Sequence, residues 1–413
     1  MNRERHLRNY GLHSWSGMVL GLFVYVICFT GSLALFAHEI ISWEDPAKRL
    51  PIAESPAPMN DIYQAWLDEL SQQGELEFVR FSYSDVHEPY FTGGADVEFE
   101  GGRHEYIERR WDTRTGDTLP ERGDGLSRWI LDFHRDLMWP QGLGGRTIGR
   151  TIVGIAGVIL LLSILTGVIA HTKIVKEFFT LRYQRSVRLK WQDTHKVLGL
   201  WGLPFFTMIA FTGAVLGVVS ILAPIVALLT FKGDQQALID EVVGVPVAAA
   251  GIPADMLSVD DLVTISHPDS GQNPVFVNLH NYGDQNARFD LFYLSETKMM
   301  SYEAIQIDGV TGEIIPDAAI STETPGNRAV AAMSPLHYGT YGGIALKLLY
   351  FVLGIALSIV TIFGLMMWIE RRLHGNEGNK SELFYRRLSH MVTGTAVGLP
   401  LASIAIFHFD KVY

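Results

Sequence analysis

The sequence predicts an α-helical membrane bundle of at least five transmembrane helices, internally duplicated, with two small α+β domains outside the membrane. Three observations support this fold class. The chain contains five long apolar runs, the order of its segments repeats in the second half, and strand-like sequence with turn motifs fills the two long connections. Charged residues make up 19% of the chain, below the roughly 25% of typical soluble domains.

The five apolar runs contain no Asp, Glu, Lys or Arg, and each has about the length of a bilayer-spanning helix, roughly 20 residues. They cover residues 14–37, 151–172, 197–231, 348–369 and 391–409. The first run follows a basic stretch, MNRERHLRNYGLH, as in a signal peptide. It is too long for that role and lacks a clear small-residue cleavage site, so we interpret it as the first membrane helix.

Basic residues in the short loops predict the orientation of the chain. The N-terminus and the loops 173–194 and 371–389 are rich in Lys and Arg, so we expect them in the cytoplasm. The long connections, residues 39–146 and 232–340, then form the two outer domains. The five membrane helices are expected within residues 1–38, 147–172, 195–231, 341–370 and 390–410.

The two halves of the chain share motifs at equal spacings, which predicts a duplication. Residues 12–31 and 194–213 each contain a histidine, a glycine four residues later and a closing Phe-Thr-Gly. The outer segments share WDTRTG at 111–116 and IDGVTG at 307–312, which are typical of a turn between strands. Helical sequence is expected at 59–73 and 255–265, and strand-like sequence at 78–83, 274–279 and 288–294.

Several classes of protein are excluded by composition and motif. Cys28 is the single cysteine, so an internal disulfide, an iron–sulfur site and covalent haem attachment through a Cys-x-x-Cys-His motif are excluded. Neither a Gly-x-Gly-x-x-Gly fingerprint nor a Walker A motif is present. The net charge of -11 argues against nucleic acid as a partner, because nucleic acid requires a basic face.

The fourteen histidines are concentrated where the chain enters or leaves the membrane. On the expected cytoplasmic side, His13 and His195 begin the first and third apolar runs, and His171 lies at the end of the second. On the outer side, His134 and His337 precede the second and fourth runs. Histidines also flank the fifth run, at positions 390 and 408, and His38 follows the first run.

Three interpretations of these histidines compete. In the first, they lie in the interface, where water forms hydrogen bonds with them. In the second, they form a proton relay or a metal site, but imidazole metal sites usually include carboxylates or thiolates, and the apolar runs contain no carboxylate. The third interpretation is axial ligation of haem in the core of a helix bundle. The glycine one turn after each histidine lies on the same helix face and leaves space for a porphyrin.

Two layers of histidines favour haem. Repeat symmetry favours His13 with His195 in one layer and, more loosely, His134 with His337 in the other. Aligning Gly157 with Gly354 leaves the second two histidines six positions out of register. His171, whose repeat equivalent is a tryptophan, competes for the first layer, so all three candidates are kept there.

Some glycine and arginine positions permit structural interpretations. Small residues commonly mediate close helix packing in membranes, and we assign this role to four glycines: Gly21, Gly31, Gly167 and Gly364. Arg146 and Arg150 flank the start of the second membrane helix. They either neutralise haem propionates or anchor the helix in the interface.

The chain resembles the PepSY-associated transmembrane proteins, iron-regulated inner-membrane proteins that include ferric-siderophore reductases. The resemblance covers nearly the whole chain. It is carried by LHSWSG at 12–17, FHRDL at 133–137, TGVIAHTKIVKEFFTLR at 166–182, WQDTHKVLGLWGLPF at 191–205, LHYGTYGG at 336–343 and LYFVLGIALSIVTIFGLMMW at 349–368. The Asp-x-x-Thr-Gly turns at 112–116 and 308–312 are similar to the PepSY signature.

The resemblance implies a bacterial inner-membrane protein with two periplasmic PepSY-like domains and non-covalent haem b, two groups with bis-histidine ligation. It implies electron transfer to a periplasmic ferric-siderophore, with release of ferrous iron. The haem-binding histidines carried over are His13, His134, His171, His195 and His337. Relatives often have a histidine where this chain has Phe206, which leaves no ligand role for that position. The electron donor is expected to be a membrane quinol or a separate reductase.

Two other functions are compatible with parts of the sequence. A membrane-anchored, non-enzymatic regulator that binds a partner through its PepSY domains predicts no cofactor and does not account for the repeated histidines. A transporter of metal or siderophore would agree with a parallel repeat, but it predicts polar groups at the middle of the membrane, where this sequence has almost none.

Overall fold

A computed structural model describes residues 3–53, 58–83, 89–99, 102–121, 125–171, 173–182, 186–238, 247–266, 273–294, 302–315, 325–375, 378 and 381–409. The chain forms two compact units, each assembled from separate segments. The helical unit contains Met1–Ile40, Asp124–Ala223 and Met333–Tyr413. The sheet unit contains Ile41–Gly123 and Pro224–Ala332.

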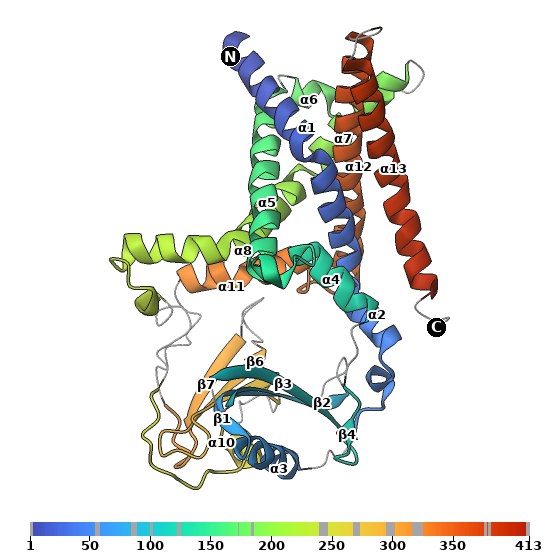
Figure 1. The fold of residues 1–413 in the computed structure, drawn as a ribbon. Coiled ribbons are helices and arrows are strands. Elements are labelled where there is room, and N and C mark those ends of the chain that lie inside the picture. Colours follow the sequence, from blue (N-terminus) through green and yellow to red (C-terminus); the bar gives the residue numbers. More distant parts are fainter. Residues whose placement is uncertain are drawn as a thin grey trace. The chain divides into compact units, whose positions relative to one another are not determined.

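Among the described residues, five helices are long and apolar enough to cross a membrane, which confirms the five apolar runs. They are α1 (Arg3–Ala34), α5 (Gly145–Ala170), α8 (Leu203–Thr230), α12 (Gly343–Gly375) and α13 (Ser381–Phe409). In the helical unit, α1 lies between α5 and α12 and contacts both, and α13 contacts α12 (Figure 1). The protein is therefore a multi-pass membrane protein.

The helix expected over residues 195–231 is divided in two, so that expectation was wrong. Helix α7 (Val187–Trp201) ends at Gly202, and α8 begins at the next residue. The reason is local chemistry. Pro204 has no backbone N–H, so it is accommodated in the first turn of a helix but interrupts the interior of one. His195 therefore lies on α7, ahead of the membrane-spanning α8.

Short helices precede two of the membrane spans. These are α4 (Leu126–Asp136) and α11 (Pro325–Tyr338), and the remaining short elements of the unit are α2 (Ala37–Glu44), η2 (Gln141–Leu143) and α6 (Ile174–Glu177). The connection from α4 to α5 covers residues 137–144 and includes η2, whereas that from α11 to α12 covers only residues 339–342. This longer connection accounts for four of the six positions by which His134 and His337 are out of register, and the other two arise within the helices.

A cluster of apolar side chains fills the interior of the bundle. Phe206, Leu357 and Val360 are buried at its centre. Residues of α1, α5 and α7 surround them, and Cys28 is among these. The sequence contributes apolar residues from several spans at this level, so the cluster is held by packing alone.

The sheet unit contains one antiparallel sheet of seven strands in the order β4-β3-β2-β1-β5-β6-β7. The strands are β1 (Gly74–Ser82), β2 (Tyr90–Phe99), β3 (Arg103–Asp112), β4 (Thr118–Leu119), β5 (Phe276–His280), β6 (Arg288–Leu294) and β7 (Tyr302–Asp308). The turns expected after Asp112 and Asp308 are present. In each of them the glycine, Gly116 or Gly312, has a positive φ, a conformation that glycine adopts without steric cost.

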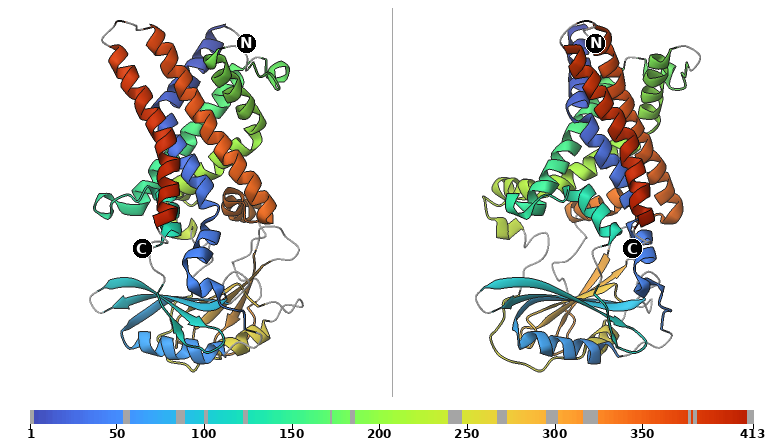
Figure 2. Two further views of the ribbon diagram at one scale, coloured as in Figure 1. Left: turned by 90° about the vertical axis from the view of Figure 1, so that its right-hand side faces the viewer. Right: turned by 45° about the vertical axis from the view of Figure 1, so that its right-hand side comes forward.

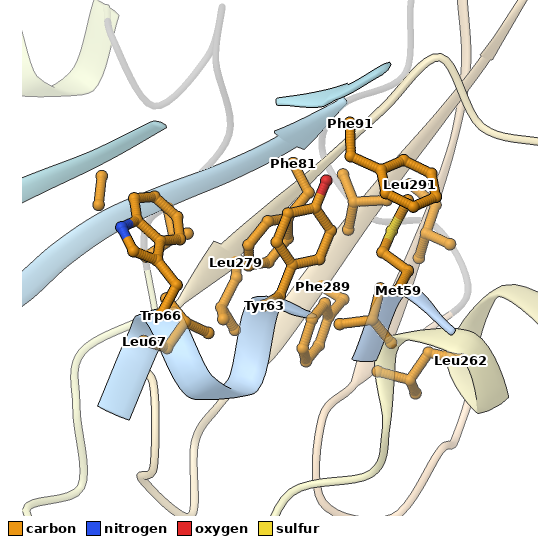
Figure 3. Close-up of a cluster of buried hydrophobic side chains, with 14 of the residues drawn as sticks. Met59, Tyr63, Trp66, Leu67, Phe81, Phe91, Leu262, Leu279, Phe289 and Leu291 are labelled. Carbon is orange, nitrogen blue, oxygen red and sulfur yellow. The ribbon is translucent and has the colours of Figure 1, made fainter. Parts of the chain in front are cut away.

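Two helices, α3 (Met59–Ser71) and α10 (Val259–Ile265), cover one face of this sheet (Figure 2). Alternation along the strands directs Val79 and Phe81 of β1 and Val277 and Leu279 of β5 into the core. Figure 3 shows how side chains of α3, including Tyr63 and Trp66, meet Leu262 of α10 and the apolar face of the strands. The unit also contains a short helix, η1 (Pro46–Arg49).

The two outer segments do not form separate domains, as the sequence suggested, but share this sheet and its core. Strand β1 of the first segment pairs with β5 of the second, so that Val79 lies opposite Leu279. An unpaired strand edge exposes a row of backbone donors and acceptors, and the β1–β5 pairing removes two such edges.

Candidate functional site

The first histidine pair lies between α1 and α7. The ring centres of His13 and His195 are 6.1 Å apart, and the ring planes are inclined at 63°. These are the two residues that repeat symmetry paired. The third candidate for this layer, His171, lies at the C-cap of α5 and lines the same cavity as the pair.

The second histidine pair lies between α4 and α11. The ring centres of His134 and His337 are 6.3 Å apart, and their planes are nearly parallel, at 21°. Along α1, Gly31 contacts His134, and it follows His13 by about 27 Å of helix rise at 1.5 Å per residue. The two pairs therefore lie near opposite ends of a helix that is long enough to cross a bilayer.

Backbone carbonyl groups orient three of the four rings. The Nδ1 atom of His13 donates to the Ser163 carbonyl at 2.8 Å, that of His134 to Ile27 at 3.0 Å, and that of His195 to Val360 at 2.7 Å. A carbonyl oxygen only accepts, so each Nδ1 carries a proton, and in the neutral imidazole each Nε2 then keeps its lone pair. This is the arrangement that metal-binding histidines use to fix their tautomer.

A hydroxyl group orients the fourth ring. His337 Nδ1 lies 2.9 Å from Thr212 Oγ1, and this hydroxyl donates its own proton to the Met208 carbonyl at 2.8 Å. The oxygen of Thr212 is therefore left to accept from Nδ1–H. All four histidines thus present an unprotonated Nε2.

A glycine faces each of the four imidazole rings across a helix contact. A Cβ atom on Gly31 would lie 2.6 Å from Cε1 of His134, and one on Gly213 would lie 2.9 Å from Cε1 of His337. The corresponding distances are 3.0 Å for Gly167 with His13 and 3.2 Å for Gly364 with His195. A side chain at any of the four positions would press against the ring.

This finding corrects the helix-packing interpretation of three glycines. Gly31, Gly167 and Gly364 make room for histidine rings, because the ring fills the gap that a second helix would otherwise occupy. Gly21 does serve helix packing, since its nearest neighbour is the side chain of Leu365 on α12. A close backbone contact between α5 and α8, Gly154 with Gly217, was not identified from the sequence.

The first pair opens into a cavity of about 1070 Å³ between α1, α5, α7 and α12. Gly17 and Gly199, each one turn after a histidine of the pair, line this cavity, and no described atom lies within 4 Å of a Cβ built on either. The deep wall is apolar and includes Val24, Phe206 and Leu357. The space expected beside the repeated His-x-x-x-Gly motifs is therefore present.

The rim of the cavity is basic. Lys173, Arg188, Arg371 and Arg372 line it, and Arg371 donates to the hydroxyl of Tyr10 at 3.2 Å. Such a rim favours anionic groups on a bound molecule.

An ion-pair network fixes the start of α7 beside the cavity. Asp193 is buried and accepts hydrogen bonds from Arg182 Nε at 2.8 Å and Nη2 at 2.7 Å. The Arg182 guanidinium holds the pKa of Asp193 well below its usual range. Lys196 Nζ contacts Asp193 at 3.3 Å and Glu177 at 2.9 Å, and its hydrogen bond lowers the pKa of Glu177. These charges hold the helix that carries His195.

The arginines that flank the start of α5 have different environments. Arg146 forms ion pairs with Asp132 at 3.3 Å and with Asp136 at 3.8 Å. The Nε atom of Arg150 is buried and has no hydrogen-bond partner among the described residues. The Arg150 carbonyl is close to Gly217, one turn after the glycine that faces His337. Arg150 is therefore the better candidate to meet an acidic group near the second pair.

The remaining candidates are apart from the two pairs. His390 is exposed on α13, and His408 lies near the end of that helix. Phe206 is only 2% exposed and belongs to the central apolar cluster. Among the residues described by the structure, no three His, Cys, Asp or Glu side chains gather to hold a metal ion by themselves.

Sequence reasoning identified the four paired histidines but not their supports. Thr212 and Gly213 belong to the Phe-Thr-Gly motif, and its repetition in the first helix was the available signal. Their role was not identified, because these residues contact histidines more than 100 positions away in the chain.

Comparison with known proteins agrees with these features. A protein of Pseudomonas aeruginosa described as uncharacterized is 26% identical over 268 residues, 62% of this chain. The matched region spans 66% of that protein's length, just under two thirds. The family model of the PepSY-associated TM region matches residues 10–371, a range that contains both histidine pairs and every strand of the sheet. The chain belongs to the PepSY-associated transmembrane family.

Proposed function

We propose that this protein is a haem b-containing reductase of the bacterial inner membrane that passes electrons across the membrane to a periplasmic ferric-siderophore. The observation that carries the proposal is the presence of two histidine pairs with almost equal separations, 6.1 and 6.3 Å between ring centres. An iron atom bound by two imidazoles, at the roughly 2 Å typical of metal–imidazole bonds, separates the ring centres by about 6 Å.

Further features of both sites support haem over a bare metal ion. Each pair offers two neutral nitrogen ligands, and a haem macrocycle provides the four others from its own ring. The four glycines permit the imidazoles to approach the helices closely. The cavity beside His13 and His195 has apolar walls and a basic rim, which suits a flat apolar ring with acidic substituents.

Bound haem would supply a reversible one-electron change at iron. The protein holds the imidazoles in one tautomer through the Nδ1 contacts, and this also raises the basicity of the ligands. The cluster around Phe206, Leu357 and Val360 provides apolar side chains inside the bundle and part of the cavity wall beside the first pair. Arg150 and the basic rim would neutralise propionates.

The direction of transfer follows from the basic loops, which favour a cytoplasmic N-terminus. His13 and His195 then lie near the cytoplasmic side, and His134 and His337 near the periplasm. The sheet unit would be periplasmic. Electrons would come from a membrane quinol or a separate reductase. Reduction releases iron because hard oxygen ligands bind the ferrous ion less well than the ferric ion.

The histidine–glycine contacts of the two halves correspond, which favours an origin of the bundle by duplication. In the first half, His13 of α1 rests on Gly167 of α5, and in the second half His195 of α7 rests on Gly364 of α12. His134 and His337 rest on the glycines of the two Phe-Thr-Gly motifs in the same way.

The test is an absorption spectrum of the purified full chain from haem-replete cells, oxidised and then reduced with dithionite, with haem quantified per chain. We expect a low-spin b-type spectrum and one haem for each histidine pair. A ferric-siderophore with a ferrous-iron trap then measures the reductase activity of the reduced protein. A colourless protein would overturn the proposal and favour the membrane-anchored regulator.

A further inference from the structure

A second polar group lies in the cavity of the first histidine pair. His171 directly follows the last residue of α5, one turn after Gly167, and its backbone N–H donates to the Gly167 and Val168 carbonyls. Its side chain lines the cavity. The Nε2 atom is buried, and none of the described residues forms a hydrogen bond with it. Such an atom is costly to leave unpaired, so it marks a position for a ligand group.

The charges around His171 favour a neutral ligand group at this position. Glu177 Oε2 lies 3.9 Å from His171 Nε2, and Lys196 contacts Glu177 at 2.9 Å and Asp193 at 3.3 Å. A carboxylate placed at Nε2 would be repelled by the carboxylate of Glu177. A hydroxyl group avoids this repulsion and forms a hydrogen bond with the imidazole.

An exposed aromatic surface lies next to Glu177 in the chain. The rings of Phe178 and Phe179 are 4.9 Å apart, and that of Phe179 is 5.8 Å from Trp201. Trp201 also donates to the Phe178 carbonyl at 3.1 Å. Phe179 is 77% exposed and Trp201 is 49% exposed. Exposed aromatic side chains are typical of a membrane interface and suit a ligand that arrives from the lipid.

We propose that His171 and Glu177 form the head-group site of a lipid-soluble hydroquinone, with its hydroxyl on His171 Nε2 and its apolar tail along the surface of Phe178, Phe179 and Trp201. The inference rests on the proposed function, for which such a molecule is the electron donor. The binding itself is independent of that function, because it uses only residues outside the two histidine pairs.

Binding is measured with heptyl-hydroxyquinoline N-oxide, a fluorescent and alkyl-tailed quinol analogue, titrated with the full chain in lipid nanodiscs. We expect saturable quenching with one site per chain. His171→Phe keeps a ring but removes the nitrogen, and is expected to weaken binding about tenfold, or ~1.4 kcal/mol. His171→Gln retains a hydrogen-bonding group, so its affinity should stay within about threefold of the wild type.

The matched control is His390→Phe, because His390 is exposed on α13 and does not line the cavity. Absence of saturable binding to the wild type, or equal affinities of the wild type and His171→Phe, would overturn the inference. So would loss of haem from His171→Phe with unchanged probe affinity, because His171 would then serve haem. A protein that contains haem but does not bind the probe overturns only this inference. A colourless protein that binds the probe overturns only the reductase function.

Discussion

The two histidine pairs share their supports but differ in their surroundings. Each imidazole has a glycine at its edge and an acceptor at Nδ1, and the ring separations differ by only 0.2 Å, 6.1 Å in one pair and 6.3 Å in the other. The planes, however, are inclined at 63° in the first pair and at 21° in the second. The first pair opens into a wide cavity with a basic rim, whereas the second lies on short helices that end before the membrane spans begin.

The features shared by both pairs are those needed to hold two imidazole rings, whereas the differing features are specific to each location. The glycine and the Nδ1 acceptor occur four times, although the acceptor is a carbonyl in three cases and a hydroxyl in the fourth. The 63° inclination of the rings and the described cavity belong to the first pair. We therefore attribute ligand binding to the shared features, and the exchange of other molecules at the first pair to its cavity.

The largest expected effect comes from removing one pair at a time. His13→Ala with His195→Ala should eliminate about half of the haem absorbance, and His134→Ala with His337→Ala should eliminate the other half, because in the proposed function each pair would hold one haem. Haem per chain is measured on folded protein. His374→Ala, at an exposed position of α12, is the control. Full haem content in either double variant would show that the missing pair is not a haem site.

A smaller effect is expected from Gly31→Ala. The new methyl group would lie 2.6 Å from the ring of His134, and such overpacking typically costs about 1–3 kcal/mol. Haem at the second pair should be released more readily in competition with apomyoglobin. Gly364→Ala meets its histidine at 3.2 Å and should disturb the first pair less.

Gly394→Ala is the control for the helix itself, since no described atom lies within 4 Å of a Cβ at that position. An equal loss of haem in all three alanine variants would indicate a general effect on the helices. It would contradict the proposal that Gly31 leaves space for the His134 ring.

Thr212→Val tests the hydroxyl that orients His337. Loss of an outer-sphere partner typically weakens metal binding by about 10–100-fold, and we expect the lower end because the ring remains packed against Gly213. Thr30→Val, in the matching Phe-Thr-Gly motif, should have little effect. Thr30 bonds only carbonyls of its own helix, those of Val26 and Ile27. Similar haem affinities in the two variants would contradict this assignment.

The least invasive test uses the inclination of the rings without any substitution. The relative orientation of two axial imidazoles sets the anisotropy of a low-spin ferric centre, so 63° and 21° should produce two distinct signals in electron paramagnetic resonance. Each signal should disappear with its own pair of histidines. A single signal from a protein with two haems would show that the bound rings have equal inclinations.

Much of the bundle was predictable because its signals are local. Apolar runs of about 20 residues identified the membrane helices, and repeated spacings paired His13 with His195. The weaker match of His134 with His337 also predicted a real contact. Most of its mismatch in register arises in the connection between α4 and α5, and connections of this kind tolerate changes of length.

The supports of the histidines and the joint sheet could not be predicted, because they depend on contacts between segments that are far apart in the sequence. The sequence motif of Thr212 does not indicate that its hydroxyl meets a histidine 125 positions later. The sequence favoured a helix-packing role for Gly31, because a glycine that faces an imidazole ring and one that faces another helix have the same local sequence. The joint sheet was missed for a similar reason, because each outer segment contains enough strand and helix sequence for a small domain of its own.

The pairing of β1 with β5 imposes an order on assembly during synthesis. Val79 must wait for Leu279, so at about 5–20 residues per second roughly 200 further residues take about 10–40 s to appear. During that interval the first four strands have an open edge, and Val79 and Phe81 lack their partners on β5, Leu279 and Val277. The nascent chain is then most exposed to aggregation. A chaperone that covers β1 would protect it, and translation pauses after residue 123 would lengthen its exposure.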